Sequence, residues 1–353
     1  MSSPIQAVVL GASGYVGGEL LRLIAAHPDF ELAAAVSDSR ADLPVAATFA
    51  HLSQALAGTR FVARDAWLDE IEDGSDVALF SAAPHGASAK IIKAILRVAN
   101  DKNLNIHVVD SSADFRYSEQ SAWEAVYGSE HGAPELLQEF TCAVPEHIDT
   151  IKTPHEGHPG CFATATLLAT VPLMQSGLTT SEVFVSGVTG STGSGRDPQA
   201  STHHPERNSN LYAYKPLAHR HSPEVAGLAT AASGRSTIVH FVPHSGPFAR
   251  GIHITLQAKA KALVNDEQLR DVYEKAYANS PFVEVLSGTP RIKNVVASNM
   301  CHIGVATDGE SVVVMSVIDN LVKGAAGGAV QWMNRLWKLP EVTGLMAPAP
   351  GWT

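Results

Sequence analysis

The sequence lacks several features that define large classes of proteins. It has only three cysteines among 353 residues, Cys142, Cys161 and Cys301, and their spacing predicts neither a disulfide framework nor a metal site. No apolar run reaches the roughly 18 residues that a membrane span needs, and the N-terminus lacks an export signal. Basic residues are also scarce, since 25 lysines and arginines stand against 35 acidic residues, and the net charge of −10 argues against nucleic acid as a partner. These absences favour a cytoplasmic globular protein, and its length allows two domains.

A glycine-rich segment follows the first apolar run. Residues 5–10 (IQAVVL) predict a buried parallel strand and residues 19–26 predict a helix, with GASGYVGG between them. Glycines in this context let the backbone turn tightly and approach a pyrophosphate, which then rests on the helix N-terminus. We therefore expect Gly11, Gly14 and Gly17 to bind a dinucleotide, the alternative being a tight turn without a ligand.

The end of the second predicted strand bears on the choice of dinucleotide. Residues 31–36 predict this strand, and Ser37, Asp38, Ser39 and Arg40 follow it. An acidic residue here selects the ribose hydroxyl of NAD, whereas an arginine accommodates the 2′-phosphate of NADP. Two serines and an arginine favour NADP, although Asp38 speaks for NAD.

Strands and helices continue to alternate up to residue 110. Residues 76–81 and 105–110 predict strands and residues 87–99 a helix, the order of a doubly wound parallel sheet. Pro84 and Arg116 both lie just after strands, at the carboxyl ends where ligands gather in such sheets. Arg116 and the neighbouring Asp114 could equally form a structural ion pair.

Cys161 lies at a break in the sequence between a Pro-Gly turn and a helical run over residues 162–174. A thiol at a helix N-terminus tends to ionise below its usual pKa of about 8.5, and the thiolate is the nucleophile. The alternative is a small buried hydrophobic residue, which describes most free cysteines. Cys142 and Cys301 fit that second description better, because each lies within a predicted apolar segment.

The second half of the chain has a different character from the first. Its alternating apolar segments predict an α+β domain with an antiparallel sheet, with strands at residues 183–188, 236–242, 251–258, 294–306 and 311–318. We expect a dinucleotide-binding domain over residues 1–160 and a catalytic and oligomerisation domain over residues 161–319. A small-residue helix from Ala325 is expected to return to the first domain, so that residues from about 320 to 353 complete it.

A thiolate beside a bound nicotinamide allows a small set of reactions. The cysteine can form a thioester with an activated acyl group, and a hydride can reduce that thioester to an aldehyde. An acid–base partner has to come from elsewhere in the chain, and the candidates are His219 and His221. Either could also be a loop histidine without a catalytic role.

Six segments together resemble the N-acetyl-γ-glutamyl-phosphate reductase family, whose members are NADPH-dependent enzymes of arginine biosynthesis. They are GASGYVGGELLRL (11–23), PHG (84–86), SADFR (112–116), PGCFAT (159–164), HRHSPE (219–224) and DNLVKGAAG (319–327). The resemblance covers nearly the whole chain and implies a Rossmann-type domain plus an α+β dimerisation domain of the semialdehyde dehydrogenase type. It implies Cys161 as the thioester-forming residue and His219 as the active-site histidine, with Glu224 nearby.

The same resemblance implies further binding residues. The phosphate-binding turn carries over to Ser13, Gly14, Tyr15 and Val16, and the nicotinamide neighbour carries over to Asn320. We expect Arg116, His221 and Glu224 to bind substrate, and a homodimer or homotetramer as the assembly.

Three other functions remain open at this point. Residues 163–168 (ATATLL) and the stretch around His203, His204 and Arg207 resemble a sister group of reductases, whose glutamyl or aminoadipyl phosphate substrate is attached to an acidic amino-group carrier protein. An aspartate-semialdehyde dehydrogenase-like enzyme would share the mechanism with a poorer match at the cysteine. An NADP-binding sensor is the non-enzymatic alternative, and an exposed nucleophile argues against it.

Overall fold

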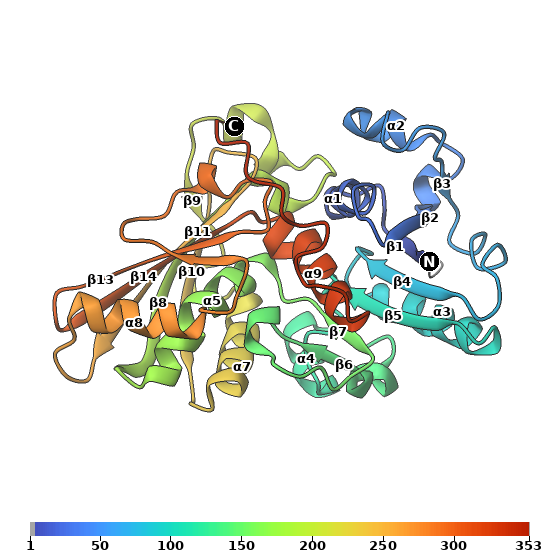
Figure 1. Ribbon diagram of the computed structural model, residues 1–353. Helices are drawn as coiled ribbons and strands as arrows, with labels where there is room; N and C mark the ends of the chain where they lie inside the picture. The colour runs from blue at the N-terminus through green and yellow to red at the C-terminus, as the bar shows by residue number, and fades with distance from the viewer. Residues whose placement is uncertain (1–3, 353) are drawn as a thin grey trace. The chain divides into compact units, whose positions relative to one another are not determined.

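The computed structural model describes residues 4–352. These residues form two compact units (Figure 1). One unit contains residues 4–143, 150–158 and 325–346, and the other contains residues 144–149, 159–324 and 347–352. The chain thus passes from the first unit to the second just before Cys161, and it returns to the first unit at residue 325.

The first unit is built on a seven-stranded parallel sheet with the order β3-β2-β1-β4-β5-β7-β6. Its apolar central strands are buried on both faces, as a parallel sheet covered by helices requires. The strand order reverses between β1 and β4, which is the switch point where ligands bind in sheets of this type. The strands are β1 (Ile5–Leu10), β2 (Phe30–Val36), β3 (Phe61–Val62), β4 (Asp76–Ser81), β5 (Asn105–Asp110), β6 (Phe140–Cys142) and β7 (His155–Gly157).

Helices from distant parts of the chain cover this sheet. Helix α9 (Gly327–Leu336) contacts both β5 and α1 (Tyr15–Ile24), and α3 (Ser88–Asp101) also contacts β5. The Trp332 indole is fully buried and its Nε1 donates a hydrogen bond to the Ala143 carbonyl at 3.0 Å. Helix α9, near the C-terminus, is therefore an integral part of the first unit. Two further helices are α2 (Val45–Thr48) and α4 (Gln120–Tyr127).

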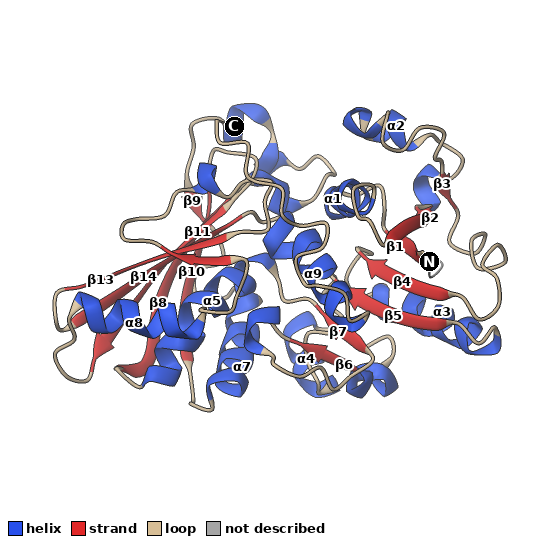
Figure 2. Ribbon diagram, in the orientation of Figure 1, coloured by secondary structure: helices blue, strands red, loops and turns tan. Residues whose placement is uncertain are grey.

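The second unit contains a seven-stranded sheet with the order β12-β13-β14-β11-β8-β10-β9. The sheet is mixed and not antiparallel as expected, because β10 is parallel to β8 and β12 is parallel to β13. Three helices, α5 (Cys161–Ser176), α7 (His221–Ser233) and α8 (Asp266–Ala276), pack against one face of it (Figure 2). The strands are β8 (Thr179–Thr189), β9 (Tyr212–Ala213), β10 (Ile238–Ser245), β11 (Ile252–Ala260), β12 (Val283–Val285), β13 (Cys301–Thr307) and β14 (Ser311–Ile318). The short helix α6 (His204–Arg207) lies in the long connection between β8 and β9.

The two faces of this sheet differ in burial. Along β8, Val183 and Val185 are buried under the helices, whereas Phe184 between them is 55% exposed on the other face. Ile238 on the neighbouring β10 is 45% exposed. The face opposite to the helices is therefore open and partly apolar in the single chain.

Helix α5 forms the centre of the second unit. All its residues from Phe162 to Met174 are buried, and it contacts both flanking helices as well as β8, β11 and β14. A helix that is apolar on every side is stable only in such a position. Two hydroxyls that cannot reach water are satisfied within the helix, since Thr166 and Thr170 each donate to the carbonyl four residues earlier.

Most predicted strands and helices are present, with one informative difference in extent. The strand expected over residues 294–306 begins only at Cys301, because Ala297 has a left-handed backbone (φ +62°) and its N–H donates to the Asp319 carboxylate at 2.6 Å. Cys301 is fully buried as expected, and burial raises the pKa of its thiol to about 12. Cys142, also expected in the core, is only half-buried.

Candidate active site

The glycine-rich turn joins β1 to α1 in the first unit. Gly11 has φ of +69°, and a Cβ at this position would lie 2.4 Å from the Ala82 carbonyl oxygen of the neighbouring strand end. A Cβ at Gly17 would lie 2.4 Å from the Gly11 carbonyl oxygen, so α1 packs closely on the turn only because both are glycines. Gly14 immediately precedes α1 and has no side chain that could accept a hydrogen bond from the first N–H groups. These N–H groups are available for an anion such as a pyrophosphate.

A group of hydroxyls lies at the end of β2, beside this turn. The Ser13 and Ser37 hydroxyls are 2.8 Å apart, and Ser39 Oγ lies 3.5 Å from Ser37 Oγ. The Asp38 carboxylate is instead engaged by Arg64, which donates to it from its backbone N–H at 2.9 Å and from its guanidinium. These hydrogen bonds lower the pKa of the exposed Asp38 carboxyl. Within residues 4–352 the Arg40 guanidinium has no ion-pair partner, so a phosphate could bind there.

The segments after β4 and β5 meet at the carboxyl edge of the sheet. Asp114 is buried and accepts hydrogen bonds from the N–H groups of Gly86 (2.6 Å) and Ala89 (3.0 Å), so it organises the turn that follows Pro84 and the start of α3. Arg116 is also buried, with Nε donating to the His158 carbonyl at 3.3 Å. Arg116 thus contacts the segment that leads directly into Cys161.

Cys161 is the first residue of α5 and is half-buried. The preceding Gly160 is extended, and its N–H donates a 2.7 Å hydrogen bond to Oε1 of Glu224. Glu224 is 1% exposed and belongs to the first turn of α7. This bond ties the turn that carries the thiol to a helix more than sixty residues away in the sequence.

The two histidines lie at the start of the same helix α7. His219 precedes it and His221 is its first residue, and their rings are 4.7 Å apart and nearly perpendicular. Both rings also contact Phe162, with centroid distances of 6.0 Å for His219 and 6.3 Å for His221. His221 Nε2 is 4.0 Å from the Glu224 carboxylate. The structure therefore brings the predicted histidines to the residue that follows Cys161.

His219 has a defined protonation state. Burial, reinforced by the positive charges of Arg220 and Lys215, lowers its pKa to about 4, so the ring is neutral at pH 7. Its Nδ1 accepts a hydrogen bond from the His221 N–H at 3.2 Å, and this contact assigns the remaining proton to Nε2. His219 thus presents an N–H donor rather than a cation.

The chain matches known proteins over nearly its whole length. Residues 6–146 match the semialdehyde dehydrogenase NAD binding domain, and residues 161–320 match the semialdehyde dehydrogenase dimerisation domain. N-acetyl-gamma-glutamyl-phosphate reductase of Methanosarcina barkeri is 38% identical over 347 residues, covering 98% of this chain and 99% of the relative. The enzyme of that name from Azotobacter vinelandii is 39% identical over 345 residues, covering 96% of each chain.

The chain belongs to the N-acetyl-gamma-glutamyl-phosphate reductase family. It is therefore an oxidoreductase, which confirms the family and the enzyme class expected from the sequence. Solved structures support the fold alone, because their sequence identity is low. Aspartate semialdehyde dehydrogenase II of Vibrio cholerae is 14% identical with a TM-score of 0.69 over 96% of this chain and 99% of that one. Aspartate semialdehyde dehydrogenase of Candida albicans, solved with NADP, has the same sequence identity and TM-score over 95% of this chain and 98% of that one.

One buried cation in the second unit was not assigned a role in the active site from the sequence. Arg207 of α6 is 7% exposed, and its Nη1 donates to the Ser245 hydroxyl. Nε and Nη2 of the same guanidinium have no partner among the residues that the structure describes. Tyr214 lies near both Arg207 and Cys161, and burial raises the pKa of its phenol well above the usual value. The only sequence signal for Arg207 was its place in a polar, histidine-rich stretch, and its burial separates it from the exposed His203 and His204.

Asn320, which the family resemblance places beside the nicotinamide, is 2% exposed. Its Oδ1 accepts from the Gly251 N–H at 2.8 Å and its Nδ2 donates to the Thr192 hydroxyl at 3.0 Å. These two hydrogen bonds fix the orientation of the Asn320 side-chain amide within the second unit. Three residues later, Lys323 is completely buried and paired with Glu146.

Proposed function

We propose that this protein reduces N-acetyl-γ-glutamyl phosphate with NADPH, giving the semialdehyde and phosphate through a thioester on Cys161. The observation that carries this proposal is the position of Cys161 at the start of the buried helix α5, with Glu224 holding the preceding turn and the histidines of α7 against Phe162. A helix start stabilises negative charge, which favours the thiolate form of the cysteine. The names of the relatives supply the substrate.

The Cys161 sulfur attacks the acyl carbon, the C–O bond to phosphate breaks, and phosphate leaves with the electron pair. A dinucleotide held at the turn that contains Gly11, Gly14 and Gly17 would supply the hydride that the thioester carbon accepts. The C–S bond then breaks, which returns the thiolate and releases the aldehyde. The overall reaction consumes the acyl phosphate, NADPH and a proton.

His219 fits the role of donor in these steps. A neutral ring with its proton on Nε2 can hydrogen bond to the oxygen that becomes negative when the acyl carbon is attacked. In this role His219 acts without first becoming a cation. His221 and Glu224 are better suited to positioning, because Glu224 is fully buried and already accepts the Gly160 N–H.

NADP is the proposed dinucleotide. The residues present fit a 2′-phosphate, since three serine hydroxyls gather at the end of β2 and the nearby Arg40 lacks a carboxylate partner within residues 4–352. Asp38, the one residue that favoured NAD, is held by Arg64. The glycine turn with Ser13, Tyr15 and Val16 would hold the pyrophosphate.

We further propose that Arg207 holds a negative group of the substrate. Its guanidinium is buried, and a buried cation is stable when it gains a hydrogen-bonded anionic partner. Two N–H-bearing nitrogens of Arg207 have no such partner among residues 4–352. The free substrate carries two such groups, a carboxylate and a phosphate, and either could pair with this guanidinium.

The assembly proposed here is a homodimer formed through the open face of the second sheet. Exposed Phe184 and Ile238 give this face an apolar character, and the matching family domain is described as a dimerisation domain.

No helix within residues 4–352 is long and apolar enough to cross a membrane. We propose that the reaction takes place in the cytoplasm.

The test is the reverse reaction, followed as NADPH formation from aldehyde, phosphate and NADP. Purified protein should act on the free N-acetylated semialdehyde, and a Cys161→Ala variant should be inactive in the same assay. Aspartate semialdehyde and a semialdehyde attached to an acidic carrier protein serve as competing substrates. A higher kcat/KM for either competitor would assign the protein to that other function.

A further inference from the structure

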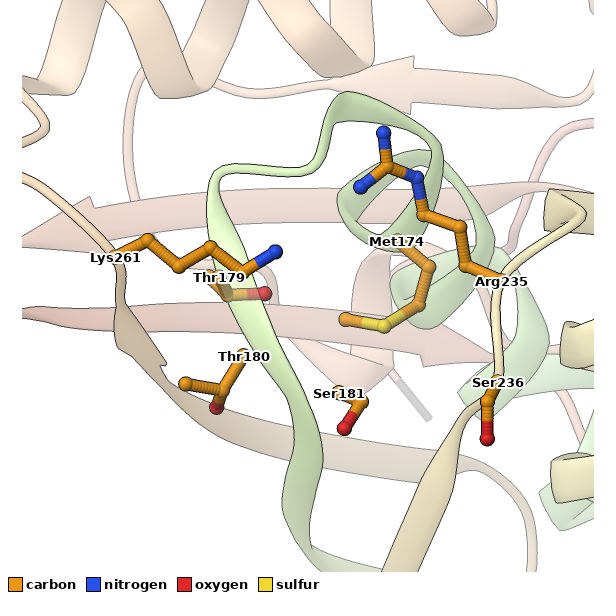
Figure 3. A pocket seen from close by; sticks show the side chains of 7 residues that line it. All are labelled: Met174, Thr179, Thr180, Ser181, Arg235, Ser236 and Lys261. Carbon is orange, nitrogen blue, oxygen red and sulfur yellow. The ribbon is translucent and has the colours of Figure 1, made fainter.

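A pocket of about 320 Å³ lies in the second unit where the end of α5 meets the start of β8. It is lined by Met174, Thr179, Thr180, Ser181, Arg235, Ser236 and Lys261, and Lys261 and Arg235 enter from two sides with Met174 between them (Figure 3). Cys161 is at the opposite end of α5, thirteen residues before Met174. At 1.5 Å per residue the two ends are about 20 Å apart, so this pocket is separate from the thiol site.

The pocket carries two positive charges and no negative one. Its seven lining residues include a guanidinium and an ammonium but no carboxylate. Across the part of the chain that the structure describes, neither the Arg235 nor the Lys261 side chain forms an ion pair or a hydrogen bond. A cation is therefore excluded as the ligand, whereas an anion with two negative charges would be matched.

The Arg235 guanidinium is positioned by the end of α5. Gly177 ends this helix with φ of +69°, and a Cβ there would lie 2.6 Å from Arg235 Nη1. The guanidinium therefore lies over the C-terminal end of the helix, where the unpaired carbonyls favour positive charge. The glycine thus leaves room for the guanidinium beside the helix end, and the guanidinium N–H groups remain available to a ligand.

A buried hydroxyl in the wall gives independent support. Thr179 is 3% exposed, and its Oγ1 has no hydrogen-bond partner among residues 4–352. Leaving a buried hydroxyl unpaired is unfavourable, so such groups usually have a partner. A ligand oxygen in the pocket would supply one, and the hydroxyls of Thr180, Ser181 and Ser236 could donate to the same group.

We propose that this pocket binds a small organic phosphate. A phosphate monoester carries about two negative charges and three terminal oxygens, which matches two cations and several hydroxyl donors better than a single carboxylate would. The volume is near the lower limit of about 300 Å³ for small-molecule sites, which suits a metabolite of a few carbons. The buried Met174 side chain provides an apolar wall for those carbons.

The experiment is calorimetric titration of the full-length protein with glycerol 3-phosphate, used as the probe. The double variant Arg235→Gln/Lys261→Gln should bind at least tenfold more weakly. Thr179→Val should also bind more weakly, with an unchanged or higher melting temperature because it removes an unpaired buried hydroxyl. Lys259→Gln is the matched control, since it removes a positive charge two residues from Lys261 outside the pocket.

Several results would overturn the proposal. Equal affinities for the wild-type protein and the double variant would show that the phosphate binds elsewhere, including the active site. Equal losses in Lys259→Gln and the double variant would show non-specific charge attraction. Equal affinity for succinate would show that the pocket does not select phosphate, and unchanged binding by Thr179→Val would exclude the hydroxyl from the site. Thr179→Val keeps the test decisive if the double variant does not fold.

Discussion

The neutral state of His219 leads to a prediction about pH. With a pKa lowered to about 4 by burial, the ring should be only about 3% protonated at pH 5.5. A histidine with the ordinary pKa of about 6.5 would be about 90% protonated at the same pH. If neutral His219 is the donor, its contribution to turnover should be nearly complete at pH 5.5 and decrease only toward pH 4.

The measurement compares kcat/KM of the wild-type protein and His219→Asn from pH 5 to 8. Ionisation of the Cys161 thiol affects both proteins, so it cancels in the ratio of their rates. The ratio should be about 10²–10⁴, the usual range for a positioned acid–base group, and should stay constant across this interval. If the ratio of wild-type to variant kcat/KM instead changed with pH, with a midpoint near pH 6.5, the neutral-donor mechanism would be refuted. The control His221→Asn should lose far less activity, and the opposite order of losses would exchange the roles of the two rings.

Three further predictions concern the thiol, the dinucleotide and the fold. Cys161→Ala should abolish aldehyde formation while leaving NADP affinity almost unchanged in a fluorescence titration, and more than a few per cent of residual activity would exclude Cys161 as the nucleophile. Arg40→Gln should raise KM for NADPH about tenfold to a hundredfold, equivalent to a loss of about 1.5–3 kcal/mol of binding free energy, and leave KM for NADH unchanged. Substitution of the exposed Arg97 by Gln is the control. A parallel rise of KM for both dinucleotides would show that Arg40 has a structural role. Burial raises the pKa of Glu156 to about 9, so the folded state retains a proton that the unfolded state loses above about pH 4.5. Wild-type stability should therefore decrease relative to Glu156→Gln by up to about 1.4 kcal/mol per pH unit between pH 5 and 8, and parallel urea-denaturation profiles against pH would contradict this.

Local patterns in the sequence predicted the limits of several strands. The strands β1, β4, β5 and β14 have the expected limits, because each is an apolar run that ends where the sheet ends. The pattern failed over residues 294–300, where apolar residues lie in a loop. Asp319, far along the chain, holds that loop by accepting the Ala297 N–H, and no local pattern can reveal such a contact.

For the candidate site as well, local motifs predicted which residues take part, whereas contacts between distant residues determine their state. Motifs predicted the glycine turn, the thiol and the histidine pair, because each lies within a few consecutive residues. The state of these groups depends on distant contacts that only the fold provides. Arg64 engages Asp38 across 26 residues and so weakens the case for NAD that Asp38 makes in the sequence.

Glu224 shows how such a contact changes the interpretation of a residue. In the sequence it is an acidic residue near two histidines, and both substrate binding and orientation of a ring are reasonable roles. In the structure its side chain is completely buried, one oxygen accepts the Gly160 N–H at 2.7 Å, and the other lies 4.0 Å from His221. A carboxylate used in this way has little capacity left for a substrate. Its position instead couples the turn before the thiol to the helix start that presents His219, so this hydrogen bond helps to set the distance between nucleophile and donor, together with the packing of Phe162 against both histidines.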